Sequence, residues 1–228
     1  MKILIPLLCA TALHAADENF YWPGPRVGQA TSTHAAVDGK PRDHLLANGV
    51  LSATFRHEDA RLQLVALEDR MNGGSLAWND PNLFTIHLKS GALPSSAMRL
   101  DKAPVVVPLQ PDAKQVNLAA RSPGQSLAAT FTDDTTGLTV QWSAILRDGS
   151  NYLRQQITLK SSKPVEVDHI EMINTRIPGA KSMGYTDGAP IACGNWFLGL
   201  EHPMAKNAAH DSTGWTPVEM EANQIKLP

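Results

Sequence analysis

Short stretches in which apolar and polar residues alternate recur along most of this chain, and they limit the folds open to it. Alternation with a period of two places successive side chains on opposite faces of a β-strand. In the second half of the chain, the links between such stretches carry Gly, Asn, Asp and Ser, which reverse the chain direction in tight turns. Four of these stretches predict an antiparallel meander: Gln115–Ala120, Ser126–Phe131, Leu138–Leu146 and Tyr152–Leu159.

Further strands are predicted on both sides of this meander. They comprise a hairpin at Val50–Arg56 and Arg61–Leu67, single strands at Leu83–Leu88, Val165–Ile173 and Ile191–Leu200, and an edge segment at Val105–Val107. The sequence contains no heptad repeat and no long amphipathic helix. A chain of 228 residues suits one large domain, so we expect an all-β antiparallel sandwich at residues 45–228, preceded by an irregular lead-in at residues 17–44.

The first 16 residues have the pattern of a secretory signal peptide. Lys2 supplies a positive charge, Ile3–Ala12 is a mainly apolar run, and small residues follow near Ala15. We therefore expect a secreted or periplasmic protein of bacterial type. Removal of this segment would leave Cys193 as the single cysteine, which excludes an internal disulfide in the mature chain.

Charge and motif content argue against several classes of partner. The chain carries 20 basic and 22 acidic side chains and a formal charge of −2, which provides no field for nucleic acid or an anionic membrane. No apolar segment reaches the roughly 18 residues that a membrane span needs. There is no cysteine pair or His-x-x-x-His motif for a metal, no nucleophilic-serine motif, and no sign of a cofactor.

A stretch rich in glycine, Gly184–Met204, holds the candidate binding residues. Asn195, Trp196, Glu201 and His202 lie within eight positions and combine an aromatic ring with amide, carboxylate and imidazole groups. An aromatic ring can stack on the apolar face of a sugar while polar groups bind its hydroxyls. The alternative is structural: Trp196 and Phe197 point to opposite faces of one strand, at least one of them belongs to the core, and Glu201-His202 closes a turn.

Two segments also resemble a known family. Tyr152–Leu159 and Gly188–Met204 are similar to the N-terminal β-supersandwich of large bacterial glycoside hydrolases of the alpha-galactosidase and endo-alpha-N-acetylgalactosaminidase types. The resemblance covers residues 45–207 and implies a galactose-mutarotase-like fold, with galactose or N-acetylgalactosamine glycans as expected partners. In that family a (β/α)8 barrel carries the catalytic carboxylates. Such a barrel needs about 250 residues, so we expect it to be missing from this chain or supplied separately.

The sequence contains no complete catalytic centre. Glycoside hydrolysis requires two carboxyl groups across the scissile bond, and spacing selects no such pair here. Glu166 and Asp168 share a face of one predicted strand, which favours a solvated surface. We therefore expect a non-catalytic domain that gives structural support or glycan contact. The alternative is a stand-alone aldose epimerase, or another polysaccharide-active enzyme, in which His87, His169, His202 and Glu201 converge.

Overall fold

Antiparallel β-sheets make up nearly all of the protein. The structure is a computed structural model that describes residues 27–37, 40–116, 118–200, 205–209 and 216–223. Within these ranges the helical elements are two short 3₁₀ turns, η1 (Ser95–Ala97) and η2 (Leu118–Arg121). No helix in this part of the chain is long and apolar enough to cross a membrane.

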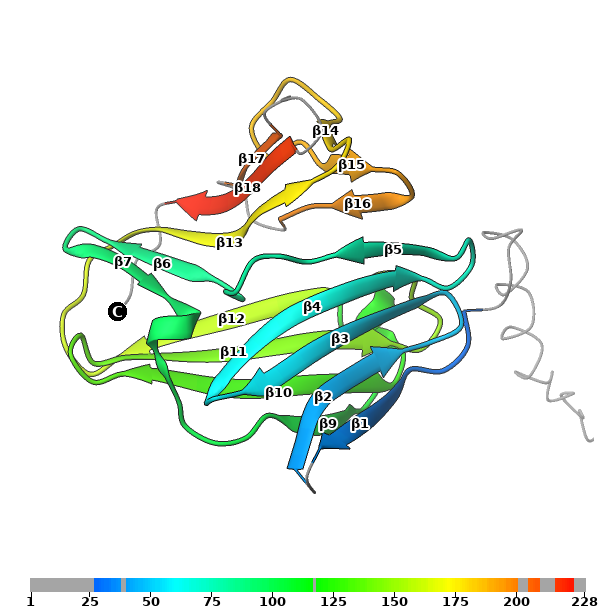
Figure 1. Ribbon diagram of the computed structural model, residues 1–228, viewed down its shortest axis with the longest axis horizontal. Coiled ribbons are helices and arrows are strands. Elements are labelled where there is room, and N and C mark those ends of the chain that lie inside the picture. The colour runs from blue at the N-terminus through cyan, green and yellow to red at the C-terminus, as the bar shows by residue number, and fades with distance from the viewer. Residues whose placement is uncertain (1–26, 38–39, 117, 201–204, 210–215, 224–228) are drawn as a thin grey trace, which may run out of the picture.

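Two five-stranded sheets form the body of the molecule. The first has the order β1-β2-β3-β4-β5 and comprises β1 (Thr31–Val37), β2 (Lys40–Ala47), β3 (Leu51–Glu58), β4 (Arg61–Asp69) and β5 (Gly74–Ala77). The second has the order β12-β11-β10-β8, with β9 also paired to β10, and comprises β8 (Arg99–Leu100), β9 (Val105–Leu109), β10 (Gly124–Asp133), β11 (Leu138–Arg147) and β12 (Arg154–Ser161). In Figure 1 the strands β2, β3 and β4 lie in front of β10, β11 and β12.

The remaining strands form two further sheets, most of whose strands lie above these layers in Figure 1. A third sheet has the order β17-β18-β13-β6-β7 and comprises β6 (Thr85–Leu88), β7 (Gly91–Pro94), β13 (Val167–Ile177), β17 (Ala205–Ala209) and β18 (Thr216–Asn223). A fourth sheet comprises β14 (Lys181–Ser182), β15 (Ile191–Cys193) and β16 (Trp196–Leu198).

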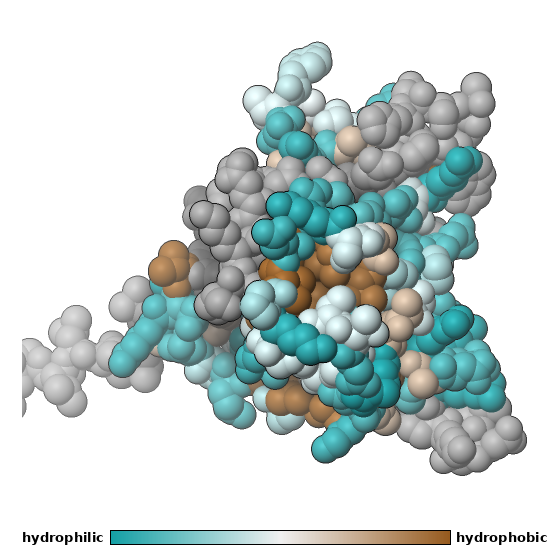
Figure 2. Space-filling model, turned by 90° about the vertical axis from the view of Figure 1, so that its left-hand side faces the viewer, coloured by the Kyte–Doolittle hydropathy of each residue, from teal (hydrophilic) through white to brown (hydrophobic). Residues whose placement is uncertain are grey.

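The inward-facing apolar side chains of the two large sheets form the core. Phe55 of β3 meets Trp142 of β11 edge to face, with ring centroids 5.3 Å apart, and Trp142 is 1% exposed. Phe131 of β10 makes a similar contact at 5.4 Å with Phe84, which precedes β6. Each such ring buries a large apolar area, so these pairs join the layers. Figure 2 looks onto one end of the sandwich, where hydrophobic residues are visible between hydrophilic ones.

The structure confirms the expected all-β antiparallel sandwich. The predicted hairpin is β3 and β4, the predicted edge segment is β9, and three of the four meander strands are β10, β11 and β12 in neighbouring positions. These are the segments with unbroken alternation and strong turn signals, in which local pattern and tertiary packing agree.

The strand predicted at 115–120 is wrong, because this region ends in the 3₁₀ turn η2. Asp112 starts a turn here by accepting hydrogen bonds from the main-chain N–H of Lys114 and the side-chain amide of Gln115. The place beside the first half of β10 is taken by β9, whose Val105–Leu109 pair with Ala128–Gly124. The segment therefore has no strand partner on this edge.

The single strand predicted at 191–200 is also wrong. The chain reverses at Gly194 and Asn195, so that β15 and β16 form a hairpin in which Cys193 pairs with Trp196. Gly194 has φ of +57°, a left-handed value that glycine adopts without strain in the first position of a two-residue hairpin turn.

Regular structure begins earlier than the expected lead-in allows. Strands β1 and β2 occupy residues 31–37 and 40–47, although Pro41 had argued against a strand. Pro41 lies near the start of β2 and pairs with Ala36, beside an irregularity in the register between Ala35 and Ala36. A proline is tolerated at such a position because its missing N–H breaks no regular ladder. The predicted signal peptide lies outside the described residues.

Candidate functional site

Two candidate residues of the glycine-rich stretch, Asn195 and Trp196, make contacts within the protein. Asn195 lies in the β15–β16 turn, and its side-chain amide donates to Asp69 Oδ2 over 3.0 Å. Trp196 is partly buried against the core, while its neighbour Phe197 is 66% exposed. The two rings thus occupy opposite faces, as the structural alternative expects. Glu201 and His202 lie outside the described residues, so sugar contact by this group stays a prediction.

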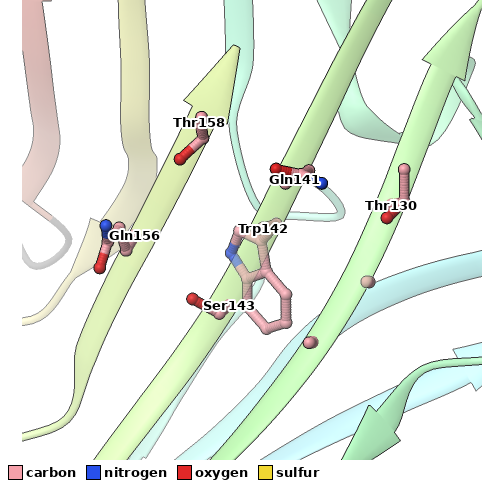
Figure 3. Close-up of a pocket in the computed structure, with 8 residues that line it drawn as sticks. Thr130, Gln141, Trp142, Ser143, Gln156 and Thr158 are labelled. Atoms are coloured by element: carbon pink, nitrogen blue, oxygen red, sulfur yellow. The ribbon is translucent and has the colours of Figure 1, made fainter. Parts of the chain in front are cut away.

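A different surface gathers polar side chains in regular rows. On the side of β10, β11 and β12 that faces away from the core, Gln141 lies between Thr130 and Thr158 in the pairing register. Ser143 lies in the next row, beside Gln156. Figure 3 shows these side chains on three neighbouring strands. We call this surface the outer face; its members are Ala128, Thr130, Thr132, Thr139, Gln141, Ser143, Ile145, Arg147, Arg154, Gln156, Thr158 and Lys160.

Period-two alternation explains why these side chains share one side. Leu138, Val140 and Trp142 of β11 are buried, so residues 139, 141 and 143 between them must point outward. The outer face is rich in Thr, Ser and Gln rather than in the Lys and Glu that usually cover solvated surfaces. Their hydroxyl and amide groups both donate and accept hydrogen bonds.

Two adjoining depressions lie on the outer face. The shallower one, of about 300 Å³, is lined by Thr130, Gln141, Ser143, Gln156 and Thr158, together with parts of Ala128, Ala129 and Trp142. The other, of about 420 Å³, is lined by Asp112, Gln115, Ala120, Ile145, Arg147, Ser150, Tyr152, Arg154 and Gln156. Gln156 lines both, so the two depressions adjoin, and we call the pair the groove.

Asp112, Gln115 and Ala120 form one wall of the larger depression, and Arg147 ties the chain on both sides of them to the sheet. One guanidinium nitrogen, Nη1, donates to the main-chain oxygens of Gln110 and Ser122 over 3.1 and 2.7 Å. Within this wall, the side-chain amide of Gln115 donates to Asp112, which lowers the pKa of that carboxyl. Tyr152, which is 40% exposed, contributes an aromatic ring to the same depression.

The lining residues of the groove are suited to bind a hydroxyl-rich ligand without catalysing a reaction on it. A ring, several neutral hydrogen-bonding groups and a few charges line the groove, which is the mixture that a sugar requires. Asp112 is the one carboxylate among the lining residues of both depressions, so the groove lacks the carboxyl pair needed for glycoside hydrolysis. Sequence reasoning missed this surface, although the polar positions between the buried residues of the meander could have indicated it.

A second group of polar residues lies on the third sheet. His87 of β6 and His169 of β13 pair across the strands and stack, with ring centroids 4.0 Å apart and 12° between their planes. His87 Nε2 is 3.8 Å from Glu171 Oε2, and His169 Nδ1 is 2.8 Å from Asp168 Oδ2. The Glu171 side chain is 15% exposed, whereas that of Asp168 is 65% exposed. Both histidines are among the residues expected from the sequence to converge in an epimerase site.

Other polar groups in the described ranges have simpler explanations. Glu166 and Lys89 form an ion pair of 2.8 Å in which both side chains are largely exposed, as expected of a solvated sheet surface. Cys193 is buried, and desolvation raises the pKa of its thiol, which disfavours the reactive thiolate. The part of the chain that the structure describes holds no group of three potential ligands suited to a metal ion.

Comparison with known proteins adds no relative to this picture. No family model, no curated protein and no solved structure matches the chain.

Proposed function

We propose that this chain is a carbohydrate-associated β-sandwich domain that contacts glycans through the outer face of β10, β11 and β12. The observation that carries the proposal is the pair of adjoining depressions, in which Gln156 lies between the Thr and Gln rows and the depression lined by Tyr152. Sugars are bound by many hydrogen bonds to hydroxyls together with contact between an aromatic ring and the pyranose face.

The position of the groove supports a binding role rather than a packing role. The buried rows of the same strands already make the core, so the outward rows are not needed to hold the two sheets together. Backbone pairing fixes the spacing of neighbouring strands at about 4.8 Å. The backbone that carries the polar rows is therefore already ordered, and ligand binding need not pay for ordering it.

Calorimetric titration with galactose- and N-acetylgalactosamine-containing oligosaccharides tests this function. Binding is expected to weaken about tenfold in the double variant Gln141→Ala and Gln156→Ala, because both amides would face the ligand. The matched control is Gln63→Ala, which removes the same type of side chain from β4 in the opposite sheet. Absence of heat with every oligosaccharide at millimolar concentration would refute the proposal.

The family resemblance would place this domain beside a catalytic barrel in an exported glycoside hydrolase, where it gives structural support or glycan contact. In this arrangement the domain binds the glycan, and a (β/α)8 barrel supplied by a longer chain or a separate protein cleaves it. The predicted signal peptide at residues 1–16 supports export to the compartment in which bacterial glycans are degraded.

A second candidate function is that of an aldose epimerase, and one specific observation favours it. Ring opening needs one group that donates a proton and another that removes one. The stacked His87 and His169, with Glu171 close to His87, provide such groups on one sheet. Polarimetry of freshly dissolved galactose tests it. An epimerase would accelerate the approach to equilibrium, and Glu171→Gln would abolish this acceleration while the exposed control Glu166→Gln would retain it.

A further inference from the structure

The charges on the outer face have one predominant sign. Arg147, Arg154 and Lys160 belong to it, and none of its members on β10, β11 or β12 is acidic. Asp112, on the wall of the larger depression, is the one carboxylate among the residues that line the groove. The whole chain has a formal charge of −2, so this local excess of positive charge runs against the overall balance.

Arg147 donates hydrogen bonds to two uncharged partners. The two acceptors of its Nη1 atom are neutral main-chain oxygens, which orient the guanidinium without neutralising it. Arg147 and Arg154 line the same depression as Tyr152, so an anionic group bound there would meet a fixed cation beside an aromatic ring. Arginine binds carboxylate and sulfate oxygens with paired N–H groups, which favours such an anion over a neutral hydroxyl.

The spacing of the basic residues suits a chain of sugars. Arg154 and Lys160 point outward from the same strand, with Gln156 and Thr158 between them. Six residues of extended strand span about 20 Å. A linear oligosaccharide lying along β12 would thus meet positive charge at both ends and neutral hydrogen-bonding groups in the middle.

We infer that the glycan bound by the outer face is acidic, with carboxylate or sulfate groups received by Arg147, Arg154 and Lys160. This inference rests on the proposed glycan-binding function and specifies the class of ligand. Uronates and sulfated sugars both present anionic oxygens that arginines bind. Experiment must therefore decide whether the bound group is a carboxylate or a sulfate.

The test measures binding of the full chain to four probes by calorimetry at low and at physiological salt. The probes are oligogalacturonate, sulfated galactan oligosaccharides, neutral galactan oligosaccharides and a short DNA duplex. At least one acidic glycan is expected to bind tenfold or more tightly than the neutral galactan, with an affinity that falls as salt rises. The acidic glycan that binds more tightly identifies the anionic group.

Variants assign the effect to the outer face. Arg154→Gln is expected to weaken acidic-glycan binding about tenfold and Lys160→Gln two- to fivefold, while Arg61→Gln on β4 of the opposite sheet leaves it unchanged. Thermal unfolding of each variant checks that it folds. Because Lys160 is exposed, its variant keeps the test valid if Arg154→Gln does not fold.

Each of the other outcomes has a distinct meaning. Neutral galactan bound as tightly as the acidic probes, without an effect of Arg154→Gln or Lys160→Gln, would overturn the inference and leave the proposed function intact. DNA bound as tightly as the acidic glycans would also overturn it, because the face would then be an unspecific polyanion site. If no glycan binds at all, both the inference and the proposed function fail.

Discussion

The Asp69 carboxylate joins the first sheet to the fourth. Replacement of Asp69 by Asn removes the hydrogen bonds of one of its oxygens and can keep those of the other. Asp69 is 7% exposed. Its Oδ1 accepts from the main-chain N–H groups of Met71 and Asn72, and its Oδ2 accepts from the side-chain amides of Asn72 and Asn195 over 2.7 and 3.0 Å. An asparagine can keep an oxygen at the place of Oδ1. Its NH₂ group then takes the place of Oδ2, where it faces the two amide donors of Asn72 and Asn195 and cannot accept from them.

The expected loss follows from these two hydrogen bonds. A typical hydrogen bond contributes about 0.5–1.5 kcal/mol to stability, so loss of both Oδ2 bonds should cost about 1–3 kcal/mol. Asn195→Ala removes one of the two and should cost about 1 kcal/mol. In the double variant the second change should add little, because the partner of Asn195 is already lost.

The effect should depend on pH in a defined direction. Donation from Asn72, and then from Asn195, lowers the pKa of Asp69 below its ordinary value. A carboxyl with a lowered folded-state pKa stabilises the protein at pH values above its unfolded pKa of about 3.9, and this contribution is lost as the pH falls through the folded pKa. Asp69→Asn removes the titration, so its deficit should be largest at neutral pH and shrink below about pH 4.

Urea unfolding followed by tryptophan fluorescence measures the deficit at pH 7 and at pH 3.5. The matched control is Asp59→Asn in the exposed β3–β4 turn, where φ of +50° suits asparagine and the expected change is within about 0.5 kcal/mol. Equal midpoints for the native protein and Asp69→Asn at pH 7, or a deficit that does not change with pH, would refute this account of Asp69.

Three further predictions concern single positions. Gly124→Ala places a Cβ against the main-chain oxygen of Leu146 in β11 and should cost about 1–3 kcal/mol in urea unfolding, whereas Gly199→Ala meets no atom within 4 Å; equal stability of the two variants would contradict this. Cys193 is buried with a raised thiol pKa, so iodoacetamide should label it only when the protein is unfolded in urea; rapid labelling of Cys193 itself in the native protein, located by peptide mapping, would argue against this burial. Glu166→Gln breaks an exposed ion pair with Lys89 and should leave the urea-unfolding midpoint unchanged at low salt, because solvent screens such a pair; a clear fall in the midpoint would be inconsistent with a solvated pair.

The sequence predicted the parts of the fold in which local pattern and packing agree. Leu138–Arg147 alternates without a break and is bounded by strong turns, so its strand and its buried face were both recognisable. Gly194-Asn195 was less clear, because a glycine within an apolar run fits either a strand interior or a turn. The turn at Asp112 was not predictable, because it depends on which segment pairs with β10, and strand pairing is set by tertiary structure.

The candidate site was harder to predict than the fold. Asn195 and Trp196 have the residue types of a sugar site, yet their partners, Asp69 and the core, lie far away in the sequence. The groove on the outer face draws Gln141, Gln156 and Tyr152 from strands and loops that only the sheet register brings together. Period-two alternation indicates which side chains point outward, but it does not show where the surface is hollow.

Location of the bound glycan on the protein tests the central claim most directly. In a titration of the ¹⁵N-labelled chain with oligogalacturonate or a galactan oligosaccharide, amide shifts are expected to cluster in β10, β11 and β12 and around Tyr152. Shifts confined to the β15–β16 hairpin at Asn195 and Trp196, or saturating binding that leaves β10, β11 and β12 unperturbed, would contradict the claim that the outer face contacts glycans.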